Sequence, residues 1–221
     1  MKPNIAIDGP AGAGKSTVAR LAAEKLGLVY IDTGAMYRAL TWKALQQNLP
    51  FEETALARLA RTTRIRFAND EGVQKVFCDD TDVTEQIREP LVTKWVSVLS
   101  SFAPVRRELT NLQRKAAASG GVVMDGRDIG TAVLPDASFK FFLTASLEER
   151  SRRRYREMVN KGTQISLAEI EADIAARDQA DRNRKVAPLV QAEDAIVIDT
   201  TDLSVEQVVD LIVAKYSQEV E

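Results

Sequence analysis

The stretch Gly9-Pro10-Ala11-Gly12-Ala13-Gly14-Lys15-Ser16 decides the fold of this chain. It has the spacing G-x-x-x-x-G-K-S and lies between a short apolar run, residues 5–7, and a helix-favouring segment, residues 18–26. Glycines let the backbone curl with its N–H groups pointing inward, and the N-terminus of the following helix adds positive potential. The pattern is that of a P-loop. It predicts that residues 9–17, from Gly9 to Thr17, bind the phosphates of a nucleotide.

Two side chains of this loop carry specific chemistry. We expect the Lys15 ammonium to reach the β- and γ-phosphates and the Ser16 hydroxyl to ligate Mg²⁺. The alternative is a glycine-rich turn that only joins a strand to a helix. Because strand, motif and helix occur in the required order, the pattern favours the phosphate site.

Composition excludes several classes of protein. The 221 residues are 45% hydrophobic and 28% charged, with a net charge of −2, which is typical of a globular protein and argues against a dedicated nucleic-acid binder. The sequence has no histidine, so histidine-based triads and histidine-ligated zinc or haem are excluded. Cys78 is the single cysteine, and no segment is apolar enough to span a membrane. We therefore expect a cytoplasmic protein without a disulfide framework.

Short apolar runs alternate with helical patterns along the chain. We predict an α/β fold in which a parallel sheet has helices on both faces. In such folds ligands bind beyond the carboxyl ends of the strands. Asp8, Asp32 and Asp125 are expected at these ends.

Two segments interrupt this alternation. Residues 63–84 alternate apolar and polar side chains around a turn at Asn69-Asp70-Glu71-Gly72, which indicates a small inserted antiparallel sheet. Capping boxes at Ser146-Leu147-Glu148-Glu149 and Ser166-Leu167-Ala168-Glu169 predict the starts of two helices, and Ser204 is expected to cap the last one. The helix that begins after Ser146 carries five arginines, namely Arg150, Arg152, Arg153, Arg154 and Arg156. This run is a solvated face, an RNA-binding stripe, or a lid whose arginines close over phosphates; next to a P-loop, we favour the lid. The chain is thus predicted as one domain, residues 1–221, with an insert at about 63–101 and a lid at about 146–165.

Further charged residues follow the predicted strands. Asp125 ends one strand, where its carboxylate is placed to hold Mg²⁺ or its water, and Arg127 and Asp128 follow directly. Thr33 and Arg38 follow the second strand, where the arginine suits a second phosphate or is simply solvated. The spacing of Arg177, Asp181 and Arg184 places them on one helix face, which is also the pattern of a surface ion pair.

With these pieces in place, the sequence resembles the bacterial cytidylate kinase family over nearly its whole length. Four stretches carry the resemblance: residues 5–16, 32–38, 125–131 and 177–188. The resemblance implies transfer of a phosphoryl group from ATP to CMP or dCMP with Mg²⁺. It also implies the nucleoside monophosphate kinase architecture of a core, a monophosphate-binding region with the inserted small sheet, and a short lid.

The resemblance also implies roles for individual residues. Arg38, Arg127 and Arg184 would bind the CMP phosphate, Arg177 and Asp181 the ribose side, and Ser97, Arg106 and Asp128 the cytosine, with Arg107 as the alternative to Arg106. The Thr33 hydroxyl would also contact substrate. Lys15, Asp125, Arg127 and Arg184 would carry catalysis, and Ser16 and Asp125 would hold the metal.

Three rival functions can be compared with this one. A P-loop GTPase would need D-x-x-G and N-K-x-D motifs, which the sequence lacks. An RNA-binding ATPase would use the arginine stripe, and a related kinase would act on UMP or another small phosphate acceptor. We expect a monomer with small-molecule substrates and no nucleic-acid or membrane partner.

Overall fold

The two ends of the chain and its middle form separate compact units. The computed structural model describes residues 1–70, 73–160 and 162–220. Unit 1 comprises Met1–Tyr30 and Ser119–Glu221, and unit 2 comprises Ile31–Ala118. The expected insert at about 63–101 lies within unit 2, and the expected lid at about 146–165 lies within unit 1. That the insert belongs to a monophosphate-binding region and that the second segment is a lid stay predictions.

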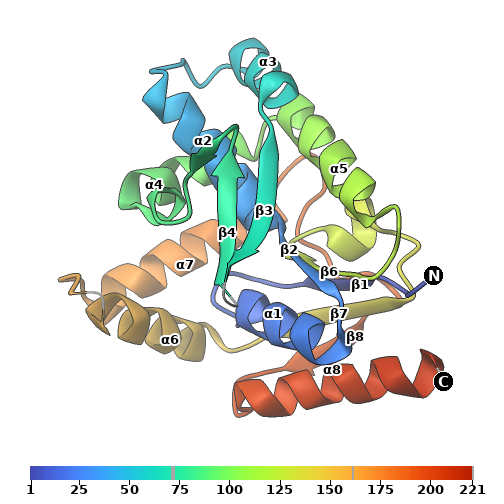
Figure 1. Cartoon of the computed structure of the whole chain (residues 1–221). Helices are drawn as coiled ribbons and strands as arrows, with labels where there is room; N and C mark the ends of the chain where they lie inside the picture. Colours follow the sequence, from blue (N-terminus) through green and yellow to red (C-terminus); the bar gives the residue numbers. More distant parts are fainter. Residues whose placement is uncertain (71–72, 161, 221) are drawn as a thin grey trace. The chain divides into compact units, whose positions relative to one another are not determined.

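Unit 1 is built on the parallel sheet that the apolar runs predicted (Figure 1). In the described part of the chain the strand order is β2-β6-β1-β7-β8; β1 pairs in parallel with β6 and β7, and β7 with β8. The strands are β1 (Ile5–Asp8), β2 (Val29–Asp32, the last two residues of which belong to unit 2), β6 (Val122–Gly126), β7 (Phe139–Thr144) and β8 (Ile196–Asp199). As predicted, Asp8, Asp32 and Asp125 lie at the carboxyl ends of strands.

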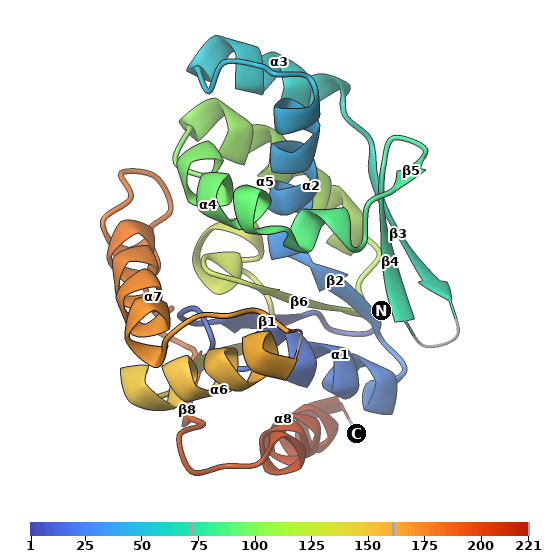
Figure 2. The ribbon, with the colours of Figure 1, turned by 90° about the vertical axis from the view of Figure 1, so that its left-hand side faces the viewer.

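The helices of unit 1 accompany this sheet. They are α1 (Lys15–Leu26), the short helical turn η2 (Ile129–Val133), α6 (Leu147–Asn160), α7 (Leu167–Arg182) and α8 (Val205–Val220). Apolar residues of α1 and α8 form one core cluster with β1 and β7, and both views show α8 running beside α1 (Figures 1 and 2). Ile5 and Ile7 are completely buried in this cluster. The cluster fixes β1 and α1, and therefore the loop between them.

Capping residues define where three helices of unit 1 begin. The predicted capping box of α7 is confirmed: Ser166 Oγ accepts from the Glu169 N–H at 3.2 Å, and the Glu169 carboxylate accepts from the Ser166 N–H at 2.8 Å. Ser204 caps α8 as predicted, accepting from the Gln207 N–H.

The box predicted at the start of α6 forms only in part. Ser146 Oγ accepts from the Glu149 N–H at 3.2 Å, but the Ser146 N–H donates to the Thr201 hydroxyl instead of to Glu149. The Glu149 carboxylate turns to Arg153, 3.0 Å away. A charged partner one turn along the helix thus replaces the return hydrogen bond of the box.

Unit 2 contains the predicted small antiparallel sheet. Among the described residues its order is β3-β4-β5, with β3 (Ile65–Asp70), β4 (Val73–Cys78) and β5 (Thr81–Asp82) (Figure 2). The helices of this unit are α2 (Thr33–Gln46), α3 (Glu53–Thr62), the turn η1 (Gln86–Arg88), α4 (Pro90–Leu99) and α5 (Ala103–Ala117). Residues 71–72 of the predicted turn lie outside the described residues.

The core of unit 2 joins α2 to this sheet. Ala35 and Ala39 of α2 pack with Val76 and Cys78 of β4. Cys78 is buried there, and burial raises the pKa of its thiol to about 11, so it is a small apolar residue of the core. Across the described residues, no helix combines the length and apolarity needed to cross a membrane.

Candidate active site

The P-loop joins β1 to α1 through a backbone that requires glycine. Gly9 has φ +148°, and a Cβ there would lie 1.9 Å from the Leu143 carbonyl oxygen of β7, so no side chain fits. Gly14 precedes α1 in the left-handed conformation, φ +84°. The loop therefore curls tightly against β7 before the helix starts at Lys15, as the motif predicted.

The Lys15 ammonium folds back onto its own loop. Its Nζ donates to the Pro10 carbonyl at 2.6 Å, and the residue is only 5% exposed. Burial lowers the pKa of Lys15 well below its ordinary value; Arg127 and Arg177 lower it further, while Asp125 and Asp8 act in the opposite direction. The Lys15 ammonium is thus buried among two arginines and two carboxylates that act on its charge.

Ser16 and Asp125 meet at the carboxyl end of β6. The Ser16 hydroxyl donates to Asp125 Oδ2 at 2.8 Å, and the Tyr30 hydroxyl donates to Oδ1 of the same carboxylate, also at 2.8 Å. Mg²⁺ prefers oxygen ligands and is commonly held by one or two protein groups together with substrate phosphates. The hydroxyl and the carboxylate supply donors of this kind, so the residues fit the metal. No group of three or more candidate metal-ligating side chains occurs among the described residues.

The residues after β6 and at the end of α7 form a charged cluster. Arg127 Nε lies 2.8 Å from Asp181 Oδ2, and Arg184 lies 3.6 Å from the other oxygen of Asp181. Arg184 also lies 3.9 Å from Asp128 Oδ1. Burial raises the pKa of Asp181, but Arg127, Arg177 and Arg184 outweigh it, so its net pKa lies below the ordinary value. The ionised Asp181 carboxylate therefore offsets part of the positive charge of these arginines and keeps them close together.

The single helix face predicted for Arg177, Asp181 and Arg184 is partly wrong. Helix α7 ends at Arg182, and Arg184 follows in the next loop, where its Nη2 donates to the Ala187 carbonyl at 2.6 Å. Ala187 has φ +48°, so the chain turns just after Arg184, and the Arg184 guanidinium lies between the Ala187 carbonyl and the Asp181 carboxylate. Spacing alone could not show this turn.

Four predicted site residues lie in unit 2. Thr33 is the first residue of α2 and is buried. Arg38 donates to the Ile87 carbonyl at 3.1 Å and to the Thr93 hydroxyl of α4 at 2.8 Å. The Ser97 carbonyl, also on α4, accepts from the Ser100 hydroxyl at 3.0 Å.

Arg106 is an inward-facing residue of unit 2. It is 3% exposed, donates to the Ser100 carbonyl at 3.3 Å, and places its guanidinium 5.3 Å from the centre of the Tyr37 ring. Its neighbour Arg107, the alternative considered from the sequence, is exposed. Arg106 is thus fixed by its surroundings, whereas Arg107 faces solvent; which of the two binds substrate stays a prediction.

Two arginines of the predicted lid helix are tied into unit 1. Arg150 is 5% exposed and lies 2.6 Å from Asp178 of α7, and Arg153 donates to the Thr200 hydroxyl after β8 at 3.0 Å. The other pairs on this helix are local: Arg152 with Glu148, and Arg154 with Glu157. The arginine run is therefore neither a uniform solvated face nor a continuous stripe, because two members face inward.

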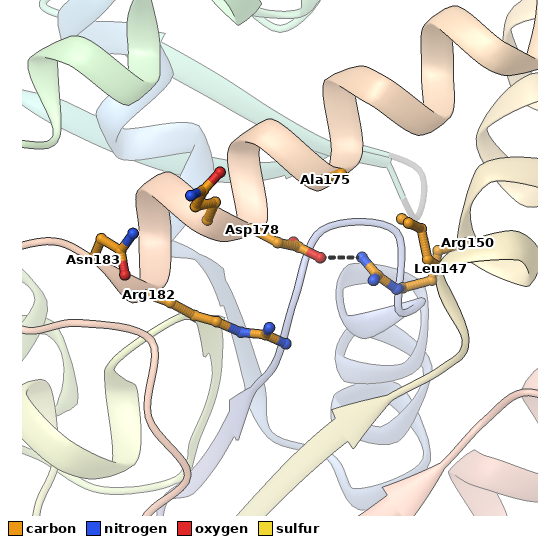
Figure 3. A pocket seen from close by; sticks show the side chains of 7 residues that line it. Leu147, Arg150, Ala175, Asp178, Arg182 and Asn183 are labelled. Atoms are coloured by element: carbon orange, nitrogen blue, oxygen red, sulfur yellow. Dashed lines mark hydrogen bonds and ion pairs between the residues drawn. The ribbon is translucent and has the colours of Figure 1, made fainter.

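A pocket of about 460 Å³ opens between α6 and α7 (Figure 3). Its lining residues are Leu147, Arg150, Ala175, Asp178, Gln179, Arg182 and Asn183. The pair of Arg150 and Asp178 lies at one side of it, next to the P-loop.

Sequence reasoning gave no role to Tyr30 or Asp178, and it predicted Arg150 as a lid arginine rather than as a partner of the P-loop backbone. Tyr30 is 95 residues from Asp125 along the chain, and Asp178 is 167 residues from Ala11, whose N–H it accepts. Tyr30 precedes a predicted site motif and Asp178 follows directly after Arg177, so adjacency to the motifs was the only available signal.

Comparison with known proteins gives the family. The family model described as cytidylate kinase matches residues 5–218. The cytidylate kinase of Desulfitobacterium hafniense (strain Y51) is 53% identical over 224 residues, covering 100% of this chain and 96% of the relative. That of Caldanaerobacter subterraneus subsp. tengcongensis is 55% identical over 207 residues, covering 93% of this chain and 91% of the relative.

A solved structure gives the same fold at much lower identity. Shikimate kinase from Acinetobacter baumannii, in complex with shikimate, matches with a TM-score of 0.50 at 17% identity, covering 99% of this chain and 96% of that chain. At this identity the likeness shows the fold alone, which is that of a P-loop kinase, as predicted. The family follows from the model and the relatives: this chain belongs to the cytidylate kinase family.

Proposed function

We propose that this chain transfers the γ-phosphoryl group of ATP to the phosphate of CMP or dCMP, giving ADP and CDP or dCDP. The observation that carries the phosphoryl-transfer part is the buried Lys15 ammonium, on which Arg127 and Arg177 act electrostatically at the end of a P-loop. The choice of CMP or dCMP rests on the names of the relatives, which share more than half of their aligned residues with this chain. UMP is therefore not favoured as the acceptor.

Within unit 1, the proposed roles follow the geometry of the loop and the charged cluster. Backbone N–H groups of the loop, residues 9–17, bind the ATP phosphates; Pro10 has no N–H, and that of Ala11 donates to Asp178. Lys15 leaves the Pro10 carbonyl to neutralise the phosphate charge. Ser16 and Asp125 would hold Mg²⁺, which supplies charge neutralisation on phosphate oxygens. Arg127 and Arg184 bind the acceptor phosphate, Arg177 and Asp181 the ribose side, and Asp128 the base.

Unit 2 contributes acceptor-binding residues in the same proposal: Thr33, Arg38, Ser97 and Arg106. Phosphoryl transfer requires in-line placement of the reacting oxygens and stabilisation of negative charge more than it requires an acid–base pair. Arginines, a lysine and backbone N–H groups meet that requirement. A protein without histidine is therefore chemically equipped for this reaction.

An ADP-release assay tests the proposed substrates. With ATP and Mg²⁺ present, we expect CMP and dCMP to support turnover and UMP to be a far poorer acceptor, because a site that pairs buried polar groups with one base discriminates by up to roughly ten-thousandfold. ADP release that does not depend on an added nucleoside monophosphate would contradict the proposal. Equal turnover with UMP and CMP would overturn the acceptor assignment.

Replacement of Lys15 tests the P-loop directly. We expect Lys15→Ala to lower kcat on the order of a hundredfold or more, because the variant loses the mobile positive charge on the transferring phosphates. Lys25→Ala is the matched control: Lys25 lies on the same helix and forms a partly exposed ion pair with Asp210. Steady-state kinetics with thermal melting separates lost chemistry from lost fold. Normal turnover by a folded Lys15→Ala variant would remove the P-loop assignment.

We also propose that the enzyme works in the cytoplasm as a monomer on small-molecule substrates. Light scattering coupled to size-exclusion chromatography measures the mass, which is 24.4 kDa for one chain.

A further inference from the structure

A buried ion pair joins α6 to α7 beside the P-loop. Arg150 Nη1 and Asp178 Oδ2 are 2.6 Å apart, and both residues are 5% exposed. Figure 3 shows the two side chains meeting next to the loop, Arg150 from the first turn of α6 and Asp178 from the second half of α7. Neither residue has a role in the proposed reaction.

Both residues also hold the backbone of Ala11. The Ala11 N–H donates to Asp178 Oδ1 at 3.1 Å, and the Ala11 carbonyl accepts from Arg150 Nη1 at 2.8 Å. Arg150 Nε donates to the Ala145 carbonyl at 3.0 Å, which fixes the plane of the guanidinium. The amide and the carbonyl of one P-loop residue are thus each held by one partner of the ion pair.

Helix α6 also packs directly on the next residue of the loop. A Cβ added to Gly12 would lie 3.1 Å from Arg150 Cβ and 3.3 Å from the Arg150 carbonyl oxygen. Pro10, on the other side of Ala11, provides the carbonyl that binds the Lys15 ammonium. Fixing Ala11 therefore fixes both the curl of the loop and the anchor of its lysine.

Energetics distinguish this pair from the other ion pairs of α6. Exposed pairs at i,i+4 spacing, such as Arg152 with Glu148, contribute little to stability. A buried pair is different, because removing one partner leaves an uncompensated charge in the interior. Losing either Arg150 or Asp178 is expected to displace the other, and with it the Ala11 backbone that both hold.

We propose that Arg150 and Asp178 are positioning residues that set the conformation of the P-loop for ATP through the Ala11 backbone. The inference rests on the proposed function, because it takes the P-loop as the site of the ATP phosphates. An error of about 1 Å in placing a reacting group costs roughly a hundredfold in rate. Residues that fix the loop before ATP binds therefore directly affect how ATP is bound and used.

Three variants test this proposal: Asp178→Ala, Arg150→Ala and the double variant. Their matched controls are Asp173→Ala, an exposed aspartate of α7, and Arg58→Ala, an exposed arginine of α3 that has no part in the predicted lid. The readouts are the Kd of ATP from calorimetry without acceptor, KM for ATP, KM for CMP and the melting temperature.

We expect each single variant to raise both the Kd and the KM of ATP about tenfold or more, which corresponds to losing a charge-assisted hydrogen bond. KM for CMP should change less than about twofold, and the controls should match the wild type. The double variant should resemble the single ones, because the two residues act as one unit. Asp178→Asn keeps an acceptor for the Ala11 N–H, so it should fall between the wild type and Asp178→Ala; it also serves if the alanine variant does not fold.

A purely structural pair gives a different result. It would lower the melting temperature and the amount of active enzyme while leaving the Kd of ATP unchanged, and this outcome overturns the inference while the proposed function stands. A wild-type protein that neither binds ATP nor phosphorylates CMP would instead remove the proposed function, and the inference with it.

Discussion

At the scale of single residues, Asp128 tests how the base is recognised. It is the second residue after β6, is 5% exposed, and its Oδ1 lies 3.9 Å from Arg184. A carboxylate accepts from the N4 amino group of cytosine but repels the O4 of uracil. Asn presents either an acceptor or a donor after rotation of its amide. We expect Asp128→Asn to lower kcat/KM for CMP and to narrow the ratio of CMP to UMP activity, measured by ADP release.

The pattern of losses identifies what Asp128 does. Asp136→Asn, at an exposed position of the same unit, is the control and should keep the wild-type ratio. A parallel loss for CMP and UMP would instead place Asp128 in positioning phosphate or metal. If the variant behaves as the wild type with both substrates, Asp128 has no part in the site.

The roles of single residues were predictable where a motif of consecutive positions specifies them. Lys15 and Ser16 follow from eight adjacent residues, because the spacing of the motif by itself specifies the loop and the phosphate chemistry of its two side chains. The bond of Tyr30 to Asp125, and that of Asp178 to Ala11, join residues 95 and 167 positions apart. Such contacts depend on how strands and helices pack, which no local pattern encodes.

At the scale of elements, the sequence predicted apolar strands and capped helices better than short helical turns. The strands of the parallel sheet follow from buried apolar runs, and α7 from its capping box. The turn η2 (Ile129–Val133) was missed, because five residues are too few for a helical period. Its first N–H groups bind Asp8, 121 and 122 positions away, so it is tertiary contact that defines this element.

The α6–α7 hairpin provides a test at this scale. We expect a lid at about residues 146–165 whose amides exchange faster in the free enzyme than those of the core. Exchange should be slowest near Arg150, which is held by Asp178, and fastest toward the exposed Val159 and Gly162. Binding an ATP analogue together with CMP should slow exchange in the far half of α6.

Helix α8 is the reference for that experiment. Its Val208, Val209 and Ile212 are buried in the core cluster of unit 1, so its protection should not depend on nucleotide. Equal protection of α6 with and without both ligands would contradict a lid.

At the scale of the whole molecule, the chain has an unusual titration behaviour. With no histidine, no side chain with an ordinary pKa changes charge between pH 5 and 8. Dependence of stability on pH in that range therefore comes from residues whose surroundings shift their pKa. Asp8, at the carboxyl end of β1, is such a residue: burial raises its pKa from 3.8 to about 6, although N–H groups of Gly130 and Ile129 bind it and oppose the shift.

The raised pKa of Asp8 fixes the sign of its effect on the stability of the chain. Between pH 3.8 and about 6 the folded protein holds a proton on Asp8 that the unfolded chain has released, so this contribution is complete below pH 3.8 and is lost as the pH rises through about 6. The rise in pKa corresponds to about 3 kcal/mol. Asp8→Asn cannot titrate, so the free energy of unfolding of the wild type should fall relative to that of the variant between pH 4 and 7. Urea titrations at a series of pH values measure this difference.

Asp194→Asn provides the opposite sign, since a hydrogen bond from Lys140 lowers the pKa of Asp194 and its contribution to stability is lost only as the pH drops below about 4. A difference between wild type and Asp8→Asn that stays constant from pH 4 to 7 would show that Asp8 is charged throughout, with its two N–H bonds outweighing the cost of burial.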